Sequence, residues 1–189
     1  MLRFILTGTP GAGKTTVLRR LETLGYGVVE EAATAFITLC LAQGHAEPWA
    51  CPSFLDDIVA LQRQRQLQAA TADVRVQFHD RSPICTHALS RYLGRPVSAA
   101  LTAEIDRITR EQVYQRRVFF VRNLGFSEPT AVRRITFADS LRFERVHEES
   151  YRAFGYELVD IPAAPLLDRV AAITAAIAEP GQLAGGTPA

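Results

Sequence analysis

The sequence predicts an α/β fold in which a five-stranded parallel sheet is flanked by helices. Short apolar segments alternate along the chain with segments in which apolar residues recur at helical spacing. Polar residues gather just after the apolar segments, and doubly wound sheets bind ligands at that end of their strands. The five strands are expected at residues 2–7, 26–29, 74–78, 117–121 and 156–161.

The segments between these strands carry signals typical of helix ends. Gly25 suits the position after the first helix, Ser53 is a candidate N-cap, and Thr136 opens a sequence like a capping box. Residues 45–53, which are rich in proline, and the arginine-bearing residues 123–135 are expected to be irregular. Helices are expected at residues 14–24, 31–42, 53–71, 84–92, 98–115, from 136 onward, and at 165–178.

Length and composition fit a single globular domain. The 189 residues are 48% apolar, and we expect one domain over residues 1–178 and a disordered tail over 179–189. The net charge is +1 and the arginines are dispersed, which argues against a nucleic acid or membrane partner. No apolar stretch is long enough to span a bilayer, and the first residues show no signal-peptide pattern.

A glycine-rich motif lies between the first expected strand and the first expected helix. Residues 8–15 have the spacing G-x-x-x-x-G-K-[ST] of the P-loop, whose backbone N–H groups cradle nucleotide phosphates. Lys14 is the one lysine among 21 basic residues, and its ammonium would reach the phosphates as a point charge. Thr15 would place a hydroxyl on a magnesium ion that bridges the phosphates. The expected ATP contacts are Gly8, Thr9, Pro10, Gly11, Ala12, Gly13, Lys14, Thr15 and Thr16.

The three cysteines do not form a disulfide framework. Together with an ATP site, this favours the cytoplasm, where thiols stay reduced. Cys40, His45 and Cys51 lack the paired spacing of zinc ligands, so we expect buried thiols and a surface histidine. The oligomeric state stays open.

Asp80 and Arg81 follow the third expected strand, at the edge of the sheet where the P-loop lies. Asp80 would hold magnesium with Thr15, directly or through water. Hydrolytic motor ATPases place a glutamate after this aspartate to polarise an attacking water, and here an arginine takes that position. A guanidinium suits an anionic group or the charge of a transferring phosphoryl. The alternative is a solvated salt bridge at the strand end.

Two further groups are candidates for catalysis. Glu31, after the second strand, could act as a general base toward an acceptor hydroxyl or could simply favour the start of the next helix. Arg133 and Arg134 could close over the phosphates as part of a lid and exclude water, or could carry surface charge. Trp49 is expected either to pack in the core or to form a flap over an acceptor pocket.

Several segments together resemble the AAA_28-type predicted ATP-binding proteins and the P-loop kinases, among them ribosylnicotinamide, deoxynucleoside and thymidylate kinases. The segments are GTPGAGKTT, VVEEAATAFI, the QRQR helix, HDRS and TFADSLRFERVHEESY. The resemblance reaches to about Ala178. It implies a lid, a phosphate-contacting Arg81 and a functional carboxylate at Glu31. The family often carries an arginine soon after that glutamate, where this chain has Thr34.

We therefore expect a phosphotransferase that uses ATP and Mg²⁺ and acts on a hydroxyl or phosphate of a small molecule, nucleoside-like or otherwise. The rival is an ATPase or nucleotide-dependent switch without a small-molecule acceptor. The sequence has no N-K-x-D motif, which argues against a Ras-like GTPase. The expected catalytic residues are Lys14, Glu31, Asp80, Arg81, Arg133 and Arg134.

Overall fold

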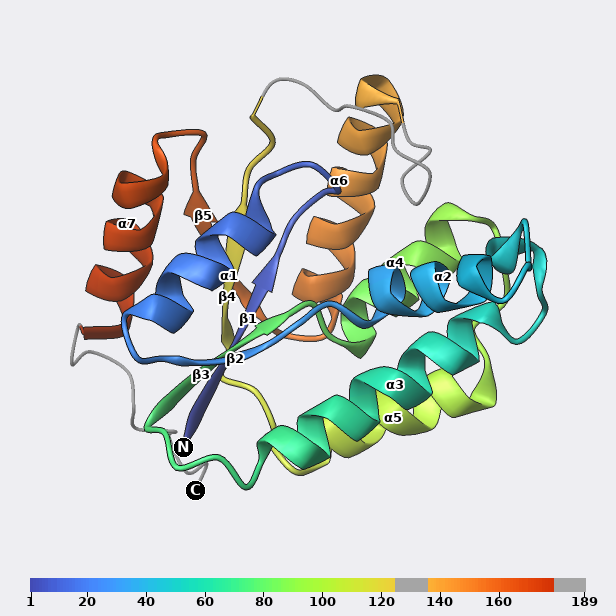
Figure 1. The fold of residues 1–189 in the computed structure, drawn as a ribbon, viewed down its shortest axis with the longest axis horizontal. Helices are drawn as coiled ribbons and strands as arrows, with labels where there is room; N and C mark the ends of the chain where they lie inside the picture. The colour runs from blue at the N-terminus through green and yellow to red at the C-terminus, as the bar shows by residue number, and fades with distance from the viewer. Residues whose placement is uncertain (125–135, 179–189) are drawn as a thin grey trace.

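The computed structural model describes residues 1–124 and 136–178. Its strands are β1 (Leu2–Thr7), β2 (Gly27–Val29), β3 (Val76–Asp80), β4 (Arg117–Val121) and β5 (Glu157–Ile161). They form one parallel sheet in the order β2-β3-β1-β4-β5, which confirms the predicted fold class (Figure 1). β1 lies in the centre, where the strand order changes direction, so the loop after β1 opens into the crevice at which such sheets bind ligands.

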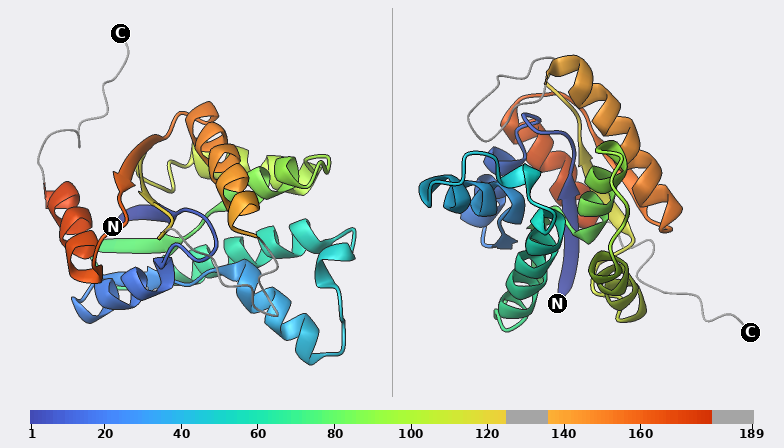
Figure 2. Two further views of the ribbon diagram at one scale, coloured as in Figure 1. Left: turned by 90° about the horizontal axis from the view of Figure 1, so that it is seen from above. Right: turned by 90° about the vertical axis from the view of Figure 1, so that its right-hand side faces the viewer.

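Seven α-helices and one short 3₁₀ helix occur in the described residues. They are α1 (Lys14–Thr23), α2 (Ala32–Ala42), η1 (Pro48–Ala50), α3 (Phe54–Ala69), α4 (Pro83–Tyr92), α5 (Ala99–Arg110), α6 (Phe137–Ala153) and α7 (Leu166–Ala178). α1 and α7 pack on one face of the sheet, and α4, α5 and α6 cover the other (Figures 1 and 2). α2, η1 and the start of α3 enclose a further apolar cluster beside the sheet.

The central strand divides its side chains between the two faces with the period of two that a strand imposes. Phe4 and Leu6 join the cluster under α1 and α7, whereas Ile5 joins the cluster under the opposite helices. Val17 and Leu21 bring the apolar stripe of α1 onto the first cluster, and both are fully buried. Each such side chain stabilises the fold by about 1.5–3 kcal/mol, so the loop that precedes α1 is held on a rigid base.

Several element boundaries differ from the sequence expectations. β3 runs over Val76–Asp80 instead of 74–78, so Asp80 is the last residue of the strand rather than the second residue after it. The helix expected over 98–115 ends at Arg110, and the chain turns at Gln112, where φ is +47°, so that Val113 and Tyr114 can enter the core. The long helix ends at Ala69 rather than at residue 71. The expected irregular segment 45–53 contains η1. Cys51 in this segment is exposed, so the expectation of a buried thiol is wrong there, whereas Cys40 is buried as expected.

Of the three predicted helix-end signals, those at Gly25 and Thr136 are confirmed and the one at Ser53 is wrong. Gly25 takes the left-handed conformation after α1 with φ +89°, and the Thr136 hydroxyl accepts a hydrogen bond from the Asp139 amide at 3.1 Å, as predicted. Ser53 does not cap α3 through its side chain, because its hydroxyl donates instead to the Asp57 carboxylate at 2.9 Å. None of the described helices is long and apolar enough to cross a membrane. The expected tail, 179–189, lies outside the described residues.

Candidate nucleotide site

The P-loop connects β1 to α1 in a conformation that depends on glycine. Gly8, Gly11 and Gly13 all have positive φ, at +132°, +86° and +80°, where side chains with a Cβ are strained. Lys14 is the first residue of α1, so the loop delivers backbone N–H groups and the positive end of a helix dipole to one place. The Lys14 ammonium folds back over the loop and donates to the Thr9 carbonyl at 2.8 Å.

The Lys14 ammonium lies among charged groups and is almost completely buried. Burial and the neighbouring Arg81 guanidinium lower the pKa of Lys14 to about 8, against the opposing Asp80 and Glu31 carboxylates. Two cations so close together repel each other, and a bound anion would relieve that repulsion. The arrangement is therefore suited to a highly charged ligand such as a polyphosphate.

Asp80, the last residue of β3, lies beside Leu6 of β1 and is 6% exposed. Within the described part of the chain its Oδ1 atom is buried and accepts no hydrogen bond. Burial raises the pKa of Asp80 to about 6, although the Lys14 cation opposes the rise. Asp80 and Thr15 both line the cavity, and a carboxylate with an unpartnered oxygen beside a hydroxyl is a set of oxygen ligands that fits Mg²⁺.

Arg81 follows Asp80 in a left-handed backbone conformation with φ +74°. Its Nε donates to Glu31 Oε1 at 2.5 Å, and its Nη1 lies 3.3 Å from Nε2 of His147 on α6. His147 Nδ1 is 3.0 Å from the Phe143 carbonyl, so this nitrogen carries the ring proton and Nε2 is left to accept from Arg81. Burial and the nearby Arg81 charge lower the pKa of His147 to about 3, which keeps the ring neutral.

Glu31 stands at the N-cap position of α2, but its side chain makes no capping bond. Its carboxylate instead bonds Arg81 and accepts from the Thr34 hydroxyl at 2.7 Å. Although burial would raise the pKa of Glu31, the Arg81 and Lys14 cations lower it to about 2. Glu30 points elsewhere and pairs with Arg19 on the surface.

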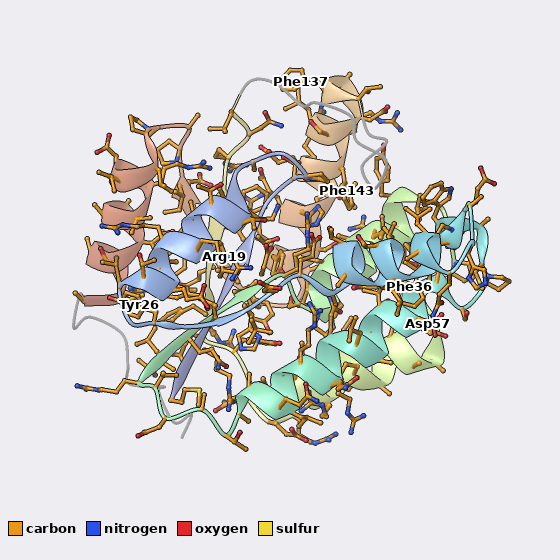
Figure 3. All side chains as sticks on the ribbon, viewed as in Figure 1. Arg19, Tyr26, Phe36, Asp57, Phe137 and Phe143 are labelled. Carbon is orange, nitrogen blue, oxygen red and sulfur yellow. The ribbon has the colours of Figure 1, made fainter. Side chains whose placement is uncertain are left out.

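A cavity of about 560 Å³ is lined both by these groups and by residues of α2, η1, α3, α4 and α6. The part lined by these helices is mostly apolar, and we call it the chamber. Figure 3 shows Phe143 on α6 at the boundary with the helices that form this chamber. The chamber is lined by Ile37, Trp49, Phe54, Ile58, Leu89, Tyr92, Leu93 and Phe143, with the polar residues Gln62, Thr86 and Asp139.

The structure thus brings Lys14, Glu31, Asp80 and Arg81 together around the P-loop. Trp49 packs against the α2–α3 cluster, as expected of a core residue, and it also lines the cavity. Arg133 and Arg134 lie outside the described residues.

Two contributors to the site were not predicted from the sequence. His147 supports Arg81 from 66 residues away. Gln62 lines the chamber, donates to the Ser82 carbonyl at 3.2 Å and accepts from the Thr86 hydroxyl at 3.0 Å. Both residues lie in segments that carry the family resemblance, Gln62 in QRQR and His147 in TFADSLRFERVHEESY, but the sequence assigned neither of them a role.

The α/β fold and the P-loop motif between β1 and α1 together define a protein of the P-loop class. The family described as AAA domain (AAA_28) matches residues 3–169, and the chain belongs to that family. No curated protein matched the sequence.

Solved structures of deoxyadenosine kinase and of NadR have a similar fold. Deoxyadenosine kinase from M. mycoides, with the products dCMP and a flexible dCDP bound, is 15% identical with a TM-score of 0.60, over 93% of this chain and 98% of that one. The same kinase with dATP is 13% identical with a TM-score of 0.58, over 94% and 100%. NadR in complex with NR is 13% identical with a TM-score of 0.67, over 97% of this chain but only 53% of NadR. At these identities the likeness establishes the fold.

Proposed function

We propose that this protein is a small-molecule kinase that transfers the γ-phosphoryl group of ATP to a hydroxyl of a nucleoside-like acceptor. The observation that carries the proposal is the single cavity of about 560 Å³, which is lined by the P-loop and includes the mostly apolar chamber. Its aromatic walls, formed by Trp49, Tyr92 and Phe143, suit a flat ring. The neighbouring structures of deoxyadenosine kinase and NadR, which hold deoxynucleotides and NR, support the same substrate class.

The charges around the P-loop favour transfer over hydrolysis. The residue after Asp80 is Arg81, which cannot accept a proton from water, and its guanidinium is suited to the charge of the transferring group. Glu31 lines the same cavity, and its carboxylate accepts a hydrogen bond from Arg81 Nε at 2.5 Å.

The balance of charge also favours a hydroxyl over a phosphate acceptor. Among the described residues that line the cavity, the cations are Lys14 and Arg81, and ATP would occupy both. An acceptor phosphate would add negative charge beside Glu31, Asp80 and Asp139. Thr34, which stands where the family often has an arginine, donates to Glu31 and supplies no positive charge.

In the proposed reaction the acceptor oxygen bonds to the γ-phosphorus as the bond to the bridging oxygen of ADP breaks. Glu31, ionised at neutral pH, accepts a hydrogen bond from the acceptor hydroxyl and orients it, and the proton leaves to this carboxylate or to water. Asp80 and Thr15 would hold Mg²⁺, which neutralises phosphate charge. Lys14 and Arg81 stabilise the transferring group, with Arg133 and Arg134 as the proposed lid arginines. ATP as donor also places the reaction in the cytoplasm.

The test is incubation with ATP, Mg²⁺ and pooled nucleosides, nucleoside monophosphates and other hydroxyl metabolites, followed by mass spectrometry of the products. We expect a phosphorylated nucleoside-like product and no phosphorylation of monophosphates. Lys14→Ala should abolish the product, while Arg20→Ala, on the exposed side of the same helix, should leave it unchanged. ATP hydrolysis without any phosphorylated product would overturn the proposal in favour of an ATPase or switch.

A further inference from the structure

Arg169 on α7 is a buried cation that lies against the P-loop. The residue is 4% exposed, and its Nη2 donates to the Ala12 carbonyl at 2.8 Å and to the Arg122 carbonyl at 3.1 Å. Its Nε is buried without an acceptor in the described residues. The guanidinium therefore fastens the P-loop to the end of β4 while part of its hydrogen-bonding capacity stays unused.

The charge of Arg169 has no carboxylate partner in the described part of the chain, which sets it apart from the other buried arginines. Arg81 pairs with Glu31, and Arg107 pairs with Glu104 at 2.7 Å and Glu111 at 2.8 Å. Burial lowers the pKa of Arg169, with no nearby charge to offset it. A buried charge without a counter-ion destabilises a fold unless something else compensates it.

The P-loop backbone separates Arg169 from the nucleotide cavity. Gly13 lines the cavity and Arg169 does not. A Cβ added to Gly13 would lie 2.9 Å from Arg169 Nη1, so the guanidinium packs directly against the loop from behind. An anion bound to the P-loop on the cavity side would therefore be separated from the Arg169 guanidinium only by the backbone of the loop.

We infer that Arg169 is a positioning residue for the nucleotide phosphates. Its hydrogen bond holds the Ala12 carbonyl away from the cradle, and its charge attracts the polyphosphate through the loop. The bound polyphosphate in turn supplies the negative charge that Arg169 does not find among the described residues. This inference rests on the proposed nucleotide site and extends it to a residue outside the P-loop motif.

The test is isothermal titration calorimetry with ATP, inorganic triphosphate and adenosine on the wild type and three variants. Arg169→Gln keeps an amide that can donate to the Ala12 carbonyl but removes the charge, whereas Arg169→Lys keeps the charge. Arg117→Gln is the matched control, because Arg117 is half-buried and also donates to a backbone carbonyl, that of Ala176 at 2.8 Å.

For Arg169→Gln we expect the dissociation constants of ATP and triphosphate to rise by the same factor of about ten, which corresponds to about 1.4 kcal/mol. Arg169→Lys should recover most of that loss, and Arg117→Gln should bind both ligands like the wild type. Equal binding of triphosphate to the wild type and to Arg169→Gln would refute the inference, as would equal losses in the glutamine and lysine variants, which would indicate a merely structural role.

The same titrations separate this inference from the proposed function. A wild type that binds neither ATP nor triphosphate would contradict both the nucleotide site and the role of Arg169. A wild type that binds triphosphate through Arg169 but phosphorylates no acceptor would contradict the kinase proposal alone.

Discussion

Replacing Asp80 with asparagine should stabilise the empty protein although it removes the proposed metal ligand. The ionised carboxylate is buried, and its Oδ1 has no partner in the described structure. Burial raises the pKa of Asp80 from 3.8 to about 6, so the folded protein holds a proton that the unfolded chain releases between those values. Stability therefore falls as the pH rises through this window, by about 3 kcal/mol when complete. Asp80→Asn should gain this amount at pH 8 and roughly half of it at pH 5.

The measurement is urea unfolding of the wild type and Asp80→Asn at both pH values, in EDTA and without nucleotide. Asp106→Asn is the control, because Asp106 is exposed on α5, and its effect should stay within about 0.5 kcal/mol at either pH. The reasoning would be refuted by an Asp80→Asn protein that is less stable than the wild type at pH 8, or by a gain that is equal at both pH values. Because a protonated carboxyl cannot ligate Mg²⁺, the same pKa predicts that the empty site binds Mg²⁺ more weakly below about pH 6.

Three further predictions concern the groups around the P-loop. Gly8→Ala should destabilise the fold by more than about 3 kcal/mol, because the new Cβ would lie 2.2 Å from the Val121 carbonyl oxygen at a φ of +132°. Glu31→Gln should lower kcat by about a hundredfold, since the ionised group that orients the acceptor and holds Arg81 is lost. His147→Phe should lower kcat about tenfold, because Arg81 Nη1 loses its acceptor while the ring still packs.

Each of these predictions has a measurement and a control. The control for Gly8→Ala is Gly44→Ala, where φ is +87° but the added Cβ has no neighbour within 4 Å. Urea unfolding should show that Gly44→Ala lowers the free energy of unfolding by only about 1–2 kcal/mol. Equal losses of stability in the two variants would contradict the steric argument. For Glu31→Gln the measurement is steady-state kinetics and the control is Glu30→Gln, which should have the kcat of the wild type. An unchanged kcat in Glu31→Gln would show that Glu31 takes no part in the mechanism. The affinity of His147→Phe for Mg²⁺–ATP, measured by calorimetry, should be close to that of the wild type. A His147→Phe protein that binds Mg²⁺–ATP more weakly but keeps its kcat would contradict the proposed role of His147 toward Arg81.

The parts of the fold that the sequence predicted are those encoded by neighbouring residues. The strands appear as short apolar runs, the P-loop as fixed glycine and lysine positions, and the start of α6 as Thr136 followed by Asp139. Ser53 had the right residue type for an N-cap, but the Asp57 carboxylate one turn later competes for its hydroxyl. The end of α5 was misplaced because Val113 and Tyr114 continue its apolar pattern while packing from a turn.

The parts of the site that escaped prediction depend on tertiary contacts. Glu31 and Arg81 were each suspected from their strand ends, but only the fold shows that they bond to each other across 50 residues. In the sequence, His147 is one polar residue of a charged helix, and only the structure shows its contact with Arg81. Arg169 is one of twenty arginines, and its contact with Ala12 spans 157 residues.

The central claim is that the P-loop serves phosphoryl transfer to a second substrate rather than hydrolysis. The most direct test is the stoichiometry of the reaction once an acceptor has been found: ADP and phosphorylated acceptor are quantified together over a time course, with and without that acceptor. We predict one phosphorylated acceptor for each ADP formed, and a much slower release of ADP when the acceptor is left out. If ADP forms at the same rate with and without the acceptor, and inorganic phosphate is the only other product, the claim of phosphoryl transfer is contradicted.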